Sequence, residues 1–195
     1  MAYDENFYRM YQEYLREPVV RANHSRMFAK LAQFLPGKLR VMDLGCGSGE
    51  YPTFDGHHYR YVGVDLINTG QLQDFIQADY IKENLTDKLP FKPNAFLSLF
   101  SIECCHPVDA RYALYEKLFA EHPSLELGAA SGFFYESKRH QPTVSETGDI
   151  VSYQTIEDPA QYISPTFDEA RIHMRTPSKM FGPDVIEVWK FLFRK

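Results

Sequence analysis

A chain of 195 residues is the size of one domain, and a content of 44% hydrophobic and 15% aromatic residues supplies a large core and argues against disorder. The formal net charge of −5, without a long run of Lys or Arg, argues against a nucleic-acid partner, because phosphates are bound by concentrated positive charge. No apolar run approaches the roughly 20 residues of a membrane span, and the acidic N-terminus lacks the pattern of a secretory signal.

The three cysteines are an odd number and two of them are adjacent. Neither a disulfide framework nor a metal site can be built from that spacing. We therefore expect a protein of the reducing cytoplasm, with no bound metal. The sequence indicates no particular oligomeric state.

Two helices are predicted ahead of the first strand. Apolar residues recur at helical spacing over residues 7–15 and again over residues 27–35. Pro18 separates the two patterns, because proline lacks a backbone N–H and disfavours a helical residue before it. Pro36 and Gly37 end the second pattern.

Three glycines follow the first predicted strand directly. The apolar run of residues 39–44 leads into Gly45, Gly47 and Gly49. A strand that ends in such a turn lets backbone N–H groups face a ligand. Asp43, just before the turn, is placed to hold a cationic group of that ligand.

A second short apolar strand, residues 61–65, ends in a carboxylate. Asp65 lies 16 residues after Gly49. In nucleotide-binding βαβ units, an acid about 20 residues beyond the glycines binds the ribose hydroxyls. The two strands together therefore predict a nucleoside-binding site.

The next strands are predicted at residues 75–79, 95–102 and 125–135. Residues 95–102 are apolar apart from two serines, which suits the buried centre of a parallel sheet. A helix is predicted from Pro107 to about His122. Only nine residues separate Asp65 from the strand at 75, fewer than the dozen or so that a parallel crossover usually takes.

The C-terminal part combines a loop and a hairpin. Residues 138–165 are polar and rich in turn formers, which is typical of a lid or binding loop, with a possible strand at 151–156. The apolar segments 170–175 and 185–193 flank a turn region and predict an antiparallel hairpin.

The stretches Asp43-Leu44-Gly45-Cys46-Gly47-Ser48-Gly49 and Val62-Gly63-Val64-Asp65 resemble the donor-binding motifs of class I S-adenosylmethionine-dependent methyltransferases. Residues 89–96 resemble the segment that leads this family into its fourth strand. The resemblance, which runs from about residue 38 to 121, implies an α/β fold: a Rossmann-like, seven-stranded, mostly parallel sheet with helices on both faces and an antiparallel C-terminal hairpin.

The resemblance also implies one methyltransferase domain in four parts: N-terminal helices (1–37), a donor-binding core (38–135), a variable loop or lid (136–166) and a closing hairpin (167–195). S-adenosylmethionine would bind over the carboxyl ends of the strands and leave as S-adenosylhomocysteine. The glycine turn would face its methionine part, the acid at residue 65 the ribose, and residues 79 and 80 the adenine. The donor-binding residues implied in this way are Asp43, Gly45, Cys46, Gly47, Gly49, Asp65, Leu66, Asp79, Tyr80 and Ser101.

Methyl transfer is an in-line displacement that requires positioning more than a catalytic signature. Glu103 and His106, just after the fourth strand, are the candidate general bases for an oxygen or nitrogen acceptor. Cys104 and Cys105 are interpreted as small packing groups, because the Pro-Cys pair of cytosine C5 methyltransferases is absent.

The predicted function is methyl transfer to O or N of a small molecule. One alternative is a protein or RNA methyltransferase. Another is a methyltransferase-like module that binds without catalysis, which the shortened helical connections favour. A nicotinamide-dependent oxidoreductase is opposed by the glycine spacing, since Gly49 falls one residue short of the position that dinucleotide sites use.

Overall fold

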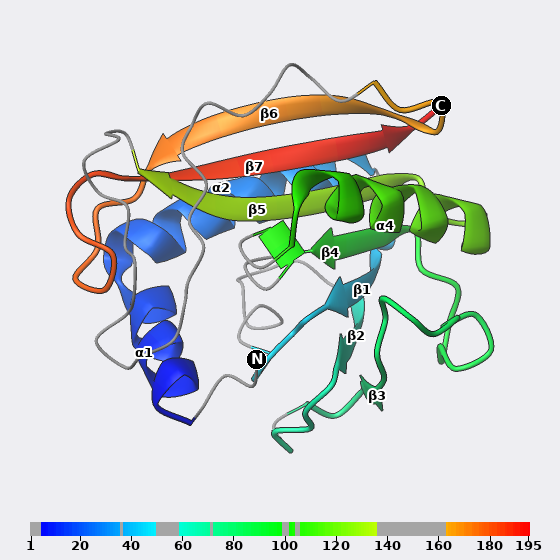
Figure 1. Ribbon diagram of the computed structural model, residues 1–195, viewed down its shortest axis with the longest axis horizontal. Helices are drawn as coiled ribbons and strands as arrows, with labels where there is room; N and C mark the ends of the chain where they lie inside the picture. The colour runs from blue at the N-terminus through cyan, green and yellow to red at the C-terminus, as the bar shows by residue number, and fades with distance from the viewer. Residues whose placement is uncertain are drawn as a thin grey trace.

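The computed structural model describes residues 5–35, 37–49, 59–70, 72–98, 102–103, 106–135 and 163–195. Their strands are β1 (Arg40–Leu44), β2 (Arg60–Asp65), β3 (Phe75–Gln77), β4 (Ala95–Ser98), β5 (Leu127–Tyr135), β6 (Phe167–Arg175) and β7 (Val185–Arg194). They form one seven-stranded sheet in the order β3-β2-β1-β4-β5-β7-β6 (Figure 1). The first five strands in that order are parallel, and β7 pairs antiparallel with both β5 and β6. The α/β fold predicted from the sequence is therefore confirmed, including its closing hairpin.

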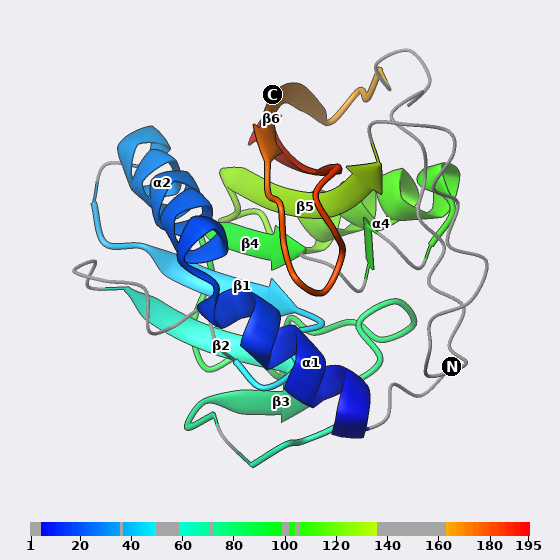
Figure 2. The same ribbon diagram turned by 90° about the vertical axis from the view of Figure 1, so that its left-hand side faces the viewer.

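Two consecutive helices precede β1. Helix α1 covers Glu5–Arg16 and α2 covers Pro18–Phe34, so the predicted break falls at Pro18, which opens the second helix. Both helices cover one face of the sheet, and α4 (Val108–Glu121) lies on the other (Figure 2). The predicted arrangement of helices on both faces is also confirmed.

The sheet separates two apolar clusters. Val41 of β1 packs with Leu31 and Trp189 on the α1–α2 face, whereas its neighbour Met42 packs with Phe119 on the α4 face. Neighbouring residues take opposite sides because side chains alternate across a strand. Burial of a large apolar side chain contributes about 1.5–3 kcal/mol, so both layers stabilise the sheet strongly.

The connection between β2 and β3 is short, and its described residues, 66–70 and 72–74, contain no helix. The strands are nevertheless parallel, with Gly63 opposite Phe75. Leu72 makes the compact crossover possible: a Cβ built on Gly63 would lie 2.5 Å from the Leu72 side chain, and one on Gly49 only 2.2 Å from it. The absence of side chains at these two glycines thus leaves the space that Leu72 fills.

Some predicted boundaries are wrong by a few residues. Strand β3 ends at Gln77 rather than at residue 79, because the backbone then turns: the N–H of Lys82 donates to the carbonyl of Asp79. Strand β4 ends at Ser98, and residues 102–103 are helical rather than extended. The possible strand at 151–156 and most of the predicted lid lie outside the described residues. None of the described helices is both long and apolar enough to cross a membrane.

Candidate active site

The carboxyl ends of the parallel strands define the candidate site. The order of strands reverses between β1 and β4, which lie side by side at the centre of the sheet although β2 and β3 separate them in the chain. In open α/β sheets, ligands bind outside the carboxyl ends of the strands at such a switch point. The glycine turn begins there, directly after β1.

The glycine turn is held by backbone hydrogen bonds. The N–H of Gly45 donates to the carbonyl of Val64 over 2.8 Å, and the N–H of Gly49 donates to the carbonyl of Cys46 over 2.9 Å. Gly47 and Gly49 have φ values of 54° and 73°, which a residue with a side chain rarely adopts. The turn therefore has a backbone conformation at Gly47 and Gly49 that residues with side chains would rarely adopt.

Asp65 joins the end of β2 to this turn. Its Oδ2 accepts a hydrogen bond from the N–H of Gly47 over 2.9 Å, and its Oδ1 accepts one from the N–H of Leu66 over 2.7 Å. The structure thus brings together the glycine turn and the acid of the second strand, 18 residues from Gly47. A half-buried carboxylate in this position can accept further hydrogen bonds from ribose hydroxyls.

Asp43 lies on the α1–α2 side of β1 and is only 1% exposed. The hydroxyl of Tyr61 donates to its Oδ2 over 2.5 Å, whereas its buried Oδ1 accepts no hydrogen bond from the described part of the chain. Burial raises the pKa of Asp43 to about 7; the bond from Tyr61 lowers it and the charge of Asp65 raises it further.

Cys46 lies inside the turn and is buried. Burial raises the pKa of its thiol, and the charges of Asp43 and Asp65 raise it further. The thiol is therefore uncharged near neutral pH and is no activated nucleophile. The Cys46 side chain packs closely against Gly63: a Cβ added to Gly63 would lie only 2.6 Å from the sulfur.

The two residues proposed for the adenine, Asp79 and Tyr80, follow β3, and Leu66, another of the implied donor-binding residues, follows β2. Asp79 is tied into a turn, where its carboxylate accepts from the N–H of Ile81 and pairs with Lys82 over 3.0 Å. The hydrogen bond from Lys82 is the main reason why the pKa of Asp79 is lowered. Tyr80 is 8% exposed and packs in the apolar cluster on the α4 face, so packing already accounts for its aromatic ring. Leu66 is 58% exposed.

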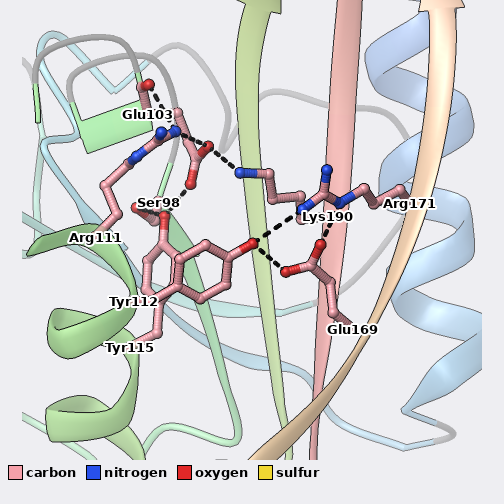
Figure 3. A network of polar contacts seen from close by, with 8 residues as sticks. All are labelled: Ser98, Glu103, Arg111, Tyr112, Tyr115, Glu169, Arg171 and Lys190. Atoms are coloured by element: carbon pink, nitrogen blue, oxygen red, sulfur yellow. Dashed lines mark hydrogen bonds and ion pairs between the residues drawn. The ribbon is translucent and has the colours of Figure 1, made fainter. Parts of the chain in front are cut away.

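Glu103, a candidate base, is buried at the centre of a polar network (Figure 3). Its Oε2 lies 2.7 Å both from a guanidinium nitrogen of Arg111 on α4 and from Nζ of Lys190 on β7, and its Oε1 accepts a hydrogen bond from Tyr115. Burial alone would raise the pKa of Glu103, but Lys190 and Arg111 hold it below the usual value. A buried carboxylate that is paired with two cations fits a structural role, since it is poorly placed to take a proton from a substrate.

The network continues toward the edge of the sheet. Lys190 lies 5.5 Å from the ring centre of Tyr112, whose hydroxyl donates to Glu169 on β6. Arg171 contacts both Glu169 and the hydroxyl of Tyr112 (Figure 3). Ser98 of β4 joins the network through its hydrogen bond with Tyr115 over 3.2 Å, so polar side chains from β4, α4, β7 and β6 are linked to one another.

His106 is partly exposed and lies just before α4. Partial burial lowers its pKa, and the positive charge of Arg111 lowers it further, so the imidazole is neutral near pH 7 and able to accept a proton. Ser101 lies outside the described residues. Within the described parts of the chain, no group of three or more His, Cys, Asp or Glu side chains could hold a metal.

Several neighbours of the site carry no strong signal in the sequence. In the sequence Tyr61 is simply an aromatic residue of β2, yet in the structure its hydroxyl donates to Asp43. The two share a face because Tyr61 pairs with Val41, and Asp43 lies two residues further along β1. Lys190 sits in an apolar run and pairs with Glu103, 87 residues away. Ile67, after β2, and Ile81, after β3, are both 42% exposed and lie next to Leu66 and to the residues proposed for the adenine in the sequence.

No protein-family model matches the sequence, and a comparison with curated proteins found no match. Solved structures do match. The 1,6-didemethyltoxoflavin N1-methyltransferase of Burkholderia thailandensis, with 1,6-didemethyltoxoflavin and S-adenosylhomocysteine bound, is 17% identical over 93% of this chain and 80% of that chain, with a TM-score of 0.58. The magnesium protoporphyrin IX methyltransferase of Synechocystis PCC 6803, with S-adenosylmethionine bound, is 15% identical over 100% of this chain and 87% of that chain, with a TM-score of 0.59.

A further match extends the range of chemistry. The (4+2)-cyclase SpnF is 12% identical over 87% of this chain and 80% of that chain, with a TM-score of 0.54. These matches establish a shared fold, but at identities this low they do not establish a shared activity. The chain has the fold of the class I S-adenosylmethionine-dependent methyltransferases.

Proposed function

We propose that the chain binds S-adenosylmethionine at the carboxyl ends of β1 and β2 and transfers its methyl group to O or N of a small molecule. The observation that carries this proposal is the hydrogen bond between Asp65 and the N–H of Gly47. It joins the two features that the resemblance assigns to the donor, the glycine turn and the ribose-binding acid, in one site.

The donor would lie along this edge of the sheet. Its methionine part would contact the turn of Gly45, Cys46, Gly47 and Gly49, with Asp43 beneath, and its ribose hydroxyls would donate to Asp65. The adenine would lie near Leu66 and Asp79, where exposed apolar side chains offer a surface for a ring. The bound donor would supply the electrophilic methyl group, and the chain's residues would orient it and exclude water.

His106 is the better of the two candidate bases for an acceptor that must lose a proton. It is partly exposed and neutral near pH 7, whereas Glu103 is engaged with Arg111 and Lys190. A small-molecule acceptor is supported by the names of the similar methyltransferases and by the acidic net charge of −5, which does not favour RNA.

A module that binds the donor without methyl transfer is the second candidate. The short β2–β3 connection favours it, since residues 66–70 and 72–74 contain no helix, and the cyclase shows that the fold serves other chemistry. Turnover with candidate acceptors separates this candidate from a methyltransferase, because both bind the donor.

Thermal unfolding with S-adenosylmethionine, S-adenosylhomocysteine or NAD tests the donor site. A ligand at 100 times its Kd stabilises by about 2.7 kcal/mol, which raises the Tm of a domain of this size by roughly 5–10 °C. We expect this rise with both adenosyl compounds and none with NAD.

Asp65→Ala should weaken the affinity for S-adenosylhomocysteine by at least about tenfold. Asp87→Ala, at an exposed turn, should leave it unchanged. Equal affinity in both variants would contradict the ribose assignment.

A further inference from the structure

Tyr61 and Asp43 meet on the α1–α2 face of the sheet. Val41 pairs with Tyr61 across β1 and β2, and Asp43 lies two residues further along β1, on the same face. The Tyr61 hydroxyl reaches along the strands to Asp43 Oδ2, 2.5 Å away. This contact leaves the second carboxylate oxygen, Oδ1, buried and without a hydrogen bond from the described residues.

None of the described groups that interact electrostatically with Asp43 carries a positive charge. The described groups that interact electrostatically with it are Tyr59, Tyr61, Cys46 and Asp65, which are neutral or acidic. No Lys, Arg or His side chain of the described residues forms an ion pair with it. A buried carboxylate is costly unless its charge is compensated.

The other two fully buried carboxylates of the described chain have different partners. Glu103 is paired with two cations. Oε1 of Glu187 lies 2.8 Å from Nε2 of His24 and accepts a hydrogen bond from the indole of Trp189 over 2.7 Å, while its Oε2 accepts none from the described residues. Among the described residues, Tyr61 alone donates a hydrogen bond to the side chain of Asp43. Of the two acids with an unpaired buried oxygen, Asp43 is the one at the end of β1, directly before the glycine turn, where a cationic ligand group could pair with it.

We propose that Tyr61 is a positioning residue for the methyl donor: its hydroxyl holds Oδ2 of Asp43, so that Oδ1 is presented to the α-ammonium group of the donor's methionine part. This inference rests on the proposed function. It adds a residue from β2 to a site otherwise built from the glycine turn and Asp65. The ammonium group supplies the missing counter-charge, and the tyrosine fixes the carboxylate without competing for that charge.

Two ligands separate this role from a general structural one. S-adenosylhomocysteine carries the α-ammonium group, whereas 5′-methylthioadenosine keeps the adenosine and the sulfur but lacks the amino-acid part. Calorimetry gives the Kd of both for the wild type and for Tyr61→Phe. We expect Tyr61→Phe to weaken the affinity for S-adenosylhomocysteine by roughly tenfold, as loss of a charge-assisted hydrogen bond does. The Kd of 5′-methylthioadenosine should stay within about twofold of the wild-type value.

Ser124→Ala is the control. It removes a hydroxyl that donates to the carbonyl of Pro93 over 2.6 Å, ahead of β4 and β5 and so at the opposite edge of the sheet, and it keeps the bond between Tyr61 and Asp43. Both affinities should equal those of the wild type. Asp43→Asn is the second variant. It should weaken the affinity for S-adenosylhomocysteine and leave that for 5′-methylthioadenosine unchanged. Adding Tyr61→Phe to Asp43→Asn should weaken the affinity for S-adenosylhomocysteine no further.

Four results would overturn the inference. Tyr61→Phe with unchanged affinity for S-adenosylhomocysteine would show that the hydroxyl plays no part in binding. An equal loss for both ligands, or an additive effect in the double variant, would show that Tyr61 acts on the fold and not through Asp43. A wild type that binds neither ligand would refute the proposed donor site itself, and that outcome is recognised before any variant is made.

Discussion

Asp43 and Glu103 are both buried carboxylates, but their surroundings set their titration in opposite directions. Burial raises the pKa of Asp43 to about 7, whereas Lys190 and Arg111 hold the pKa of Glu103 below its usual value despite burial. The fold therefore tolerates a charge at Glu103 and disfavours one at Asp43. This asymmetry is expected where one acid serves the fold and the other awaits a cationic ligand.

The raised pKa of Asp43 predicts how stability depends on pH. The carboxyl of the unfolded chain titrates near 3.9, so between roughly pH 4 and 7 the folded protein holds a proton that the unfolded chain lacks. The free energy of unfolding therefore falls as pH rises through this window. Asp43→Asn cannot ionise, and we expect it to raise the Tm of the ligand-free protein by roughly 5–10 °C more at pH 8 than at pH 4.

Differential scanning calorimetry at both pH values measures this effect. Asp74→Asn, at an exposed position, serves as the control and should shift Tm equally at the two pH values. The same Tm difference between Asp43→Asn and the wild type at pH 4 and pH 8 would contradict a raised pKa at Asp43.

The network around Glu103 acts between elements. It links the segment after β4 to α4 through Arg111 and to β7 through Lys190. Glu103→Gln keeps the shape of the side chain but leaves two buried cations without their counter-charge. We expect the free energy of unfolding to fall by about 3–5 kcal/mol, as when one partner of a buried ion pair is removed. Urea titration gives this value directly.

An exposed ion pair is the control for this change. Asp168→Asn removes the partner of Lys195, where both side chains are well exposed, and should cost less than about 1 kcal/mol. If Glu103 were instead the general base, Glu103→Gln would keep its stability and lose turnover. That result would reverse the structural assignment.

The elements themselves could be predicted because their signals are local. Strand β1 reads as an apolar run ended by glycines, and the break at Pro18 follows from one residue type. The pairing of Glu103 with Lys190 could not be predicted, since it joins residues 87 positions apart and depends on the register of β7. The parallel crossover between β2 and β3 could not be predicted from its nine residues for a related reason. It depends on Leu72 packing into the space left by the missing side chains of Gly49 and Gly63.

At the scale of the molecule, the two ends of the described chain share one core. Strand β7 lies between β5 and β6, and its Trp189 stacks edge-on against His24 and Phe28 of α2. Glu187, two residues earlier in β7, contacts His24 over 2.8 Å. The first helices thus depend on the last strand, and neither layer is complete without the other.

This interlocking predicts a single cooperative unfolding transition. Trp189 is the one tryptophan of the chain and is 1% exposed, so its fluorescence reports on the α1–α2 face. Far-UV circular dichroism also reports on α4, across the sheet. We expect the urea midpoints from the two signals to coincide, because a two-state domain loses both layers together. A Trp189 transition at lower urea than the circular dichroism transition would show instead that the N-terminal helices detach while the sheet and α4 remain folded.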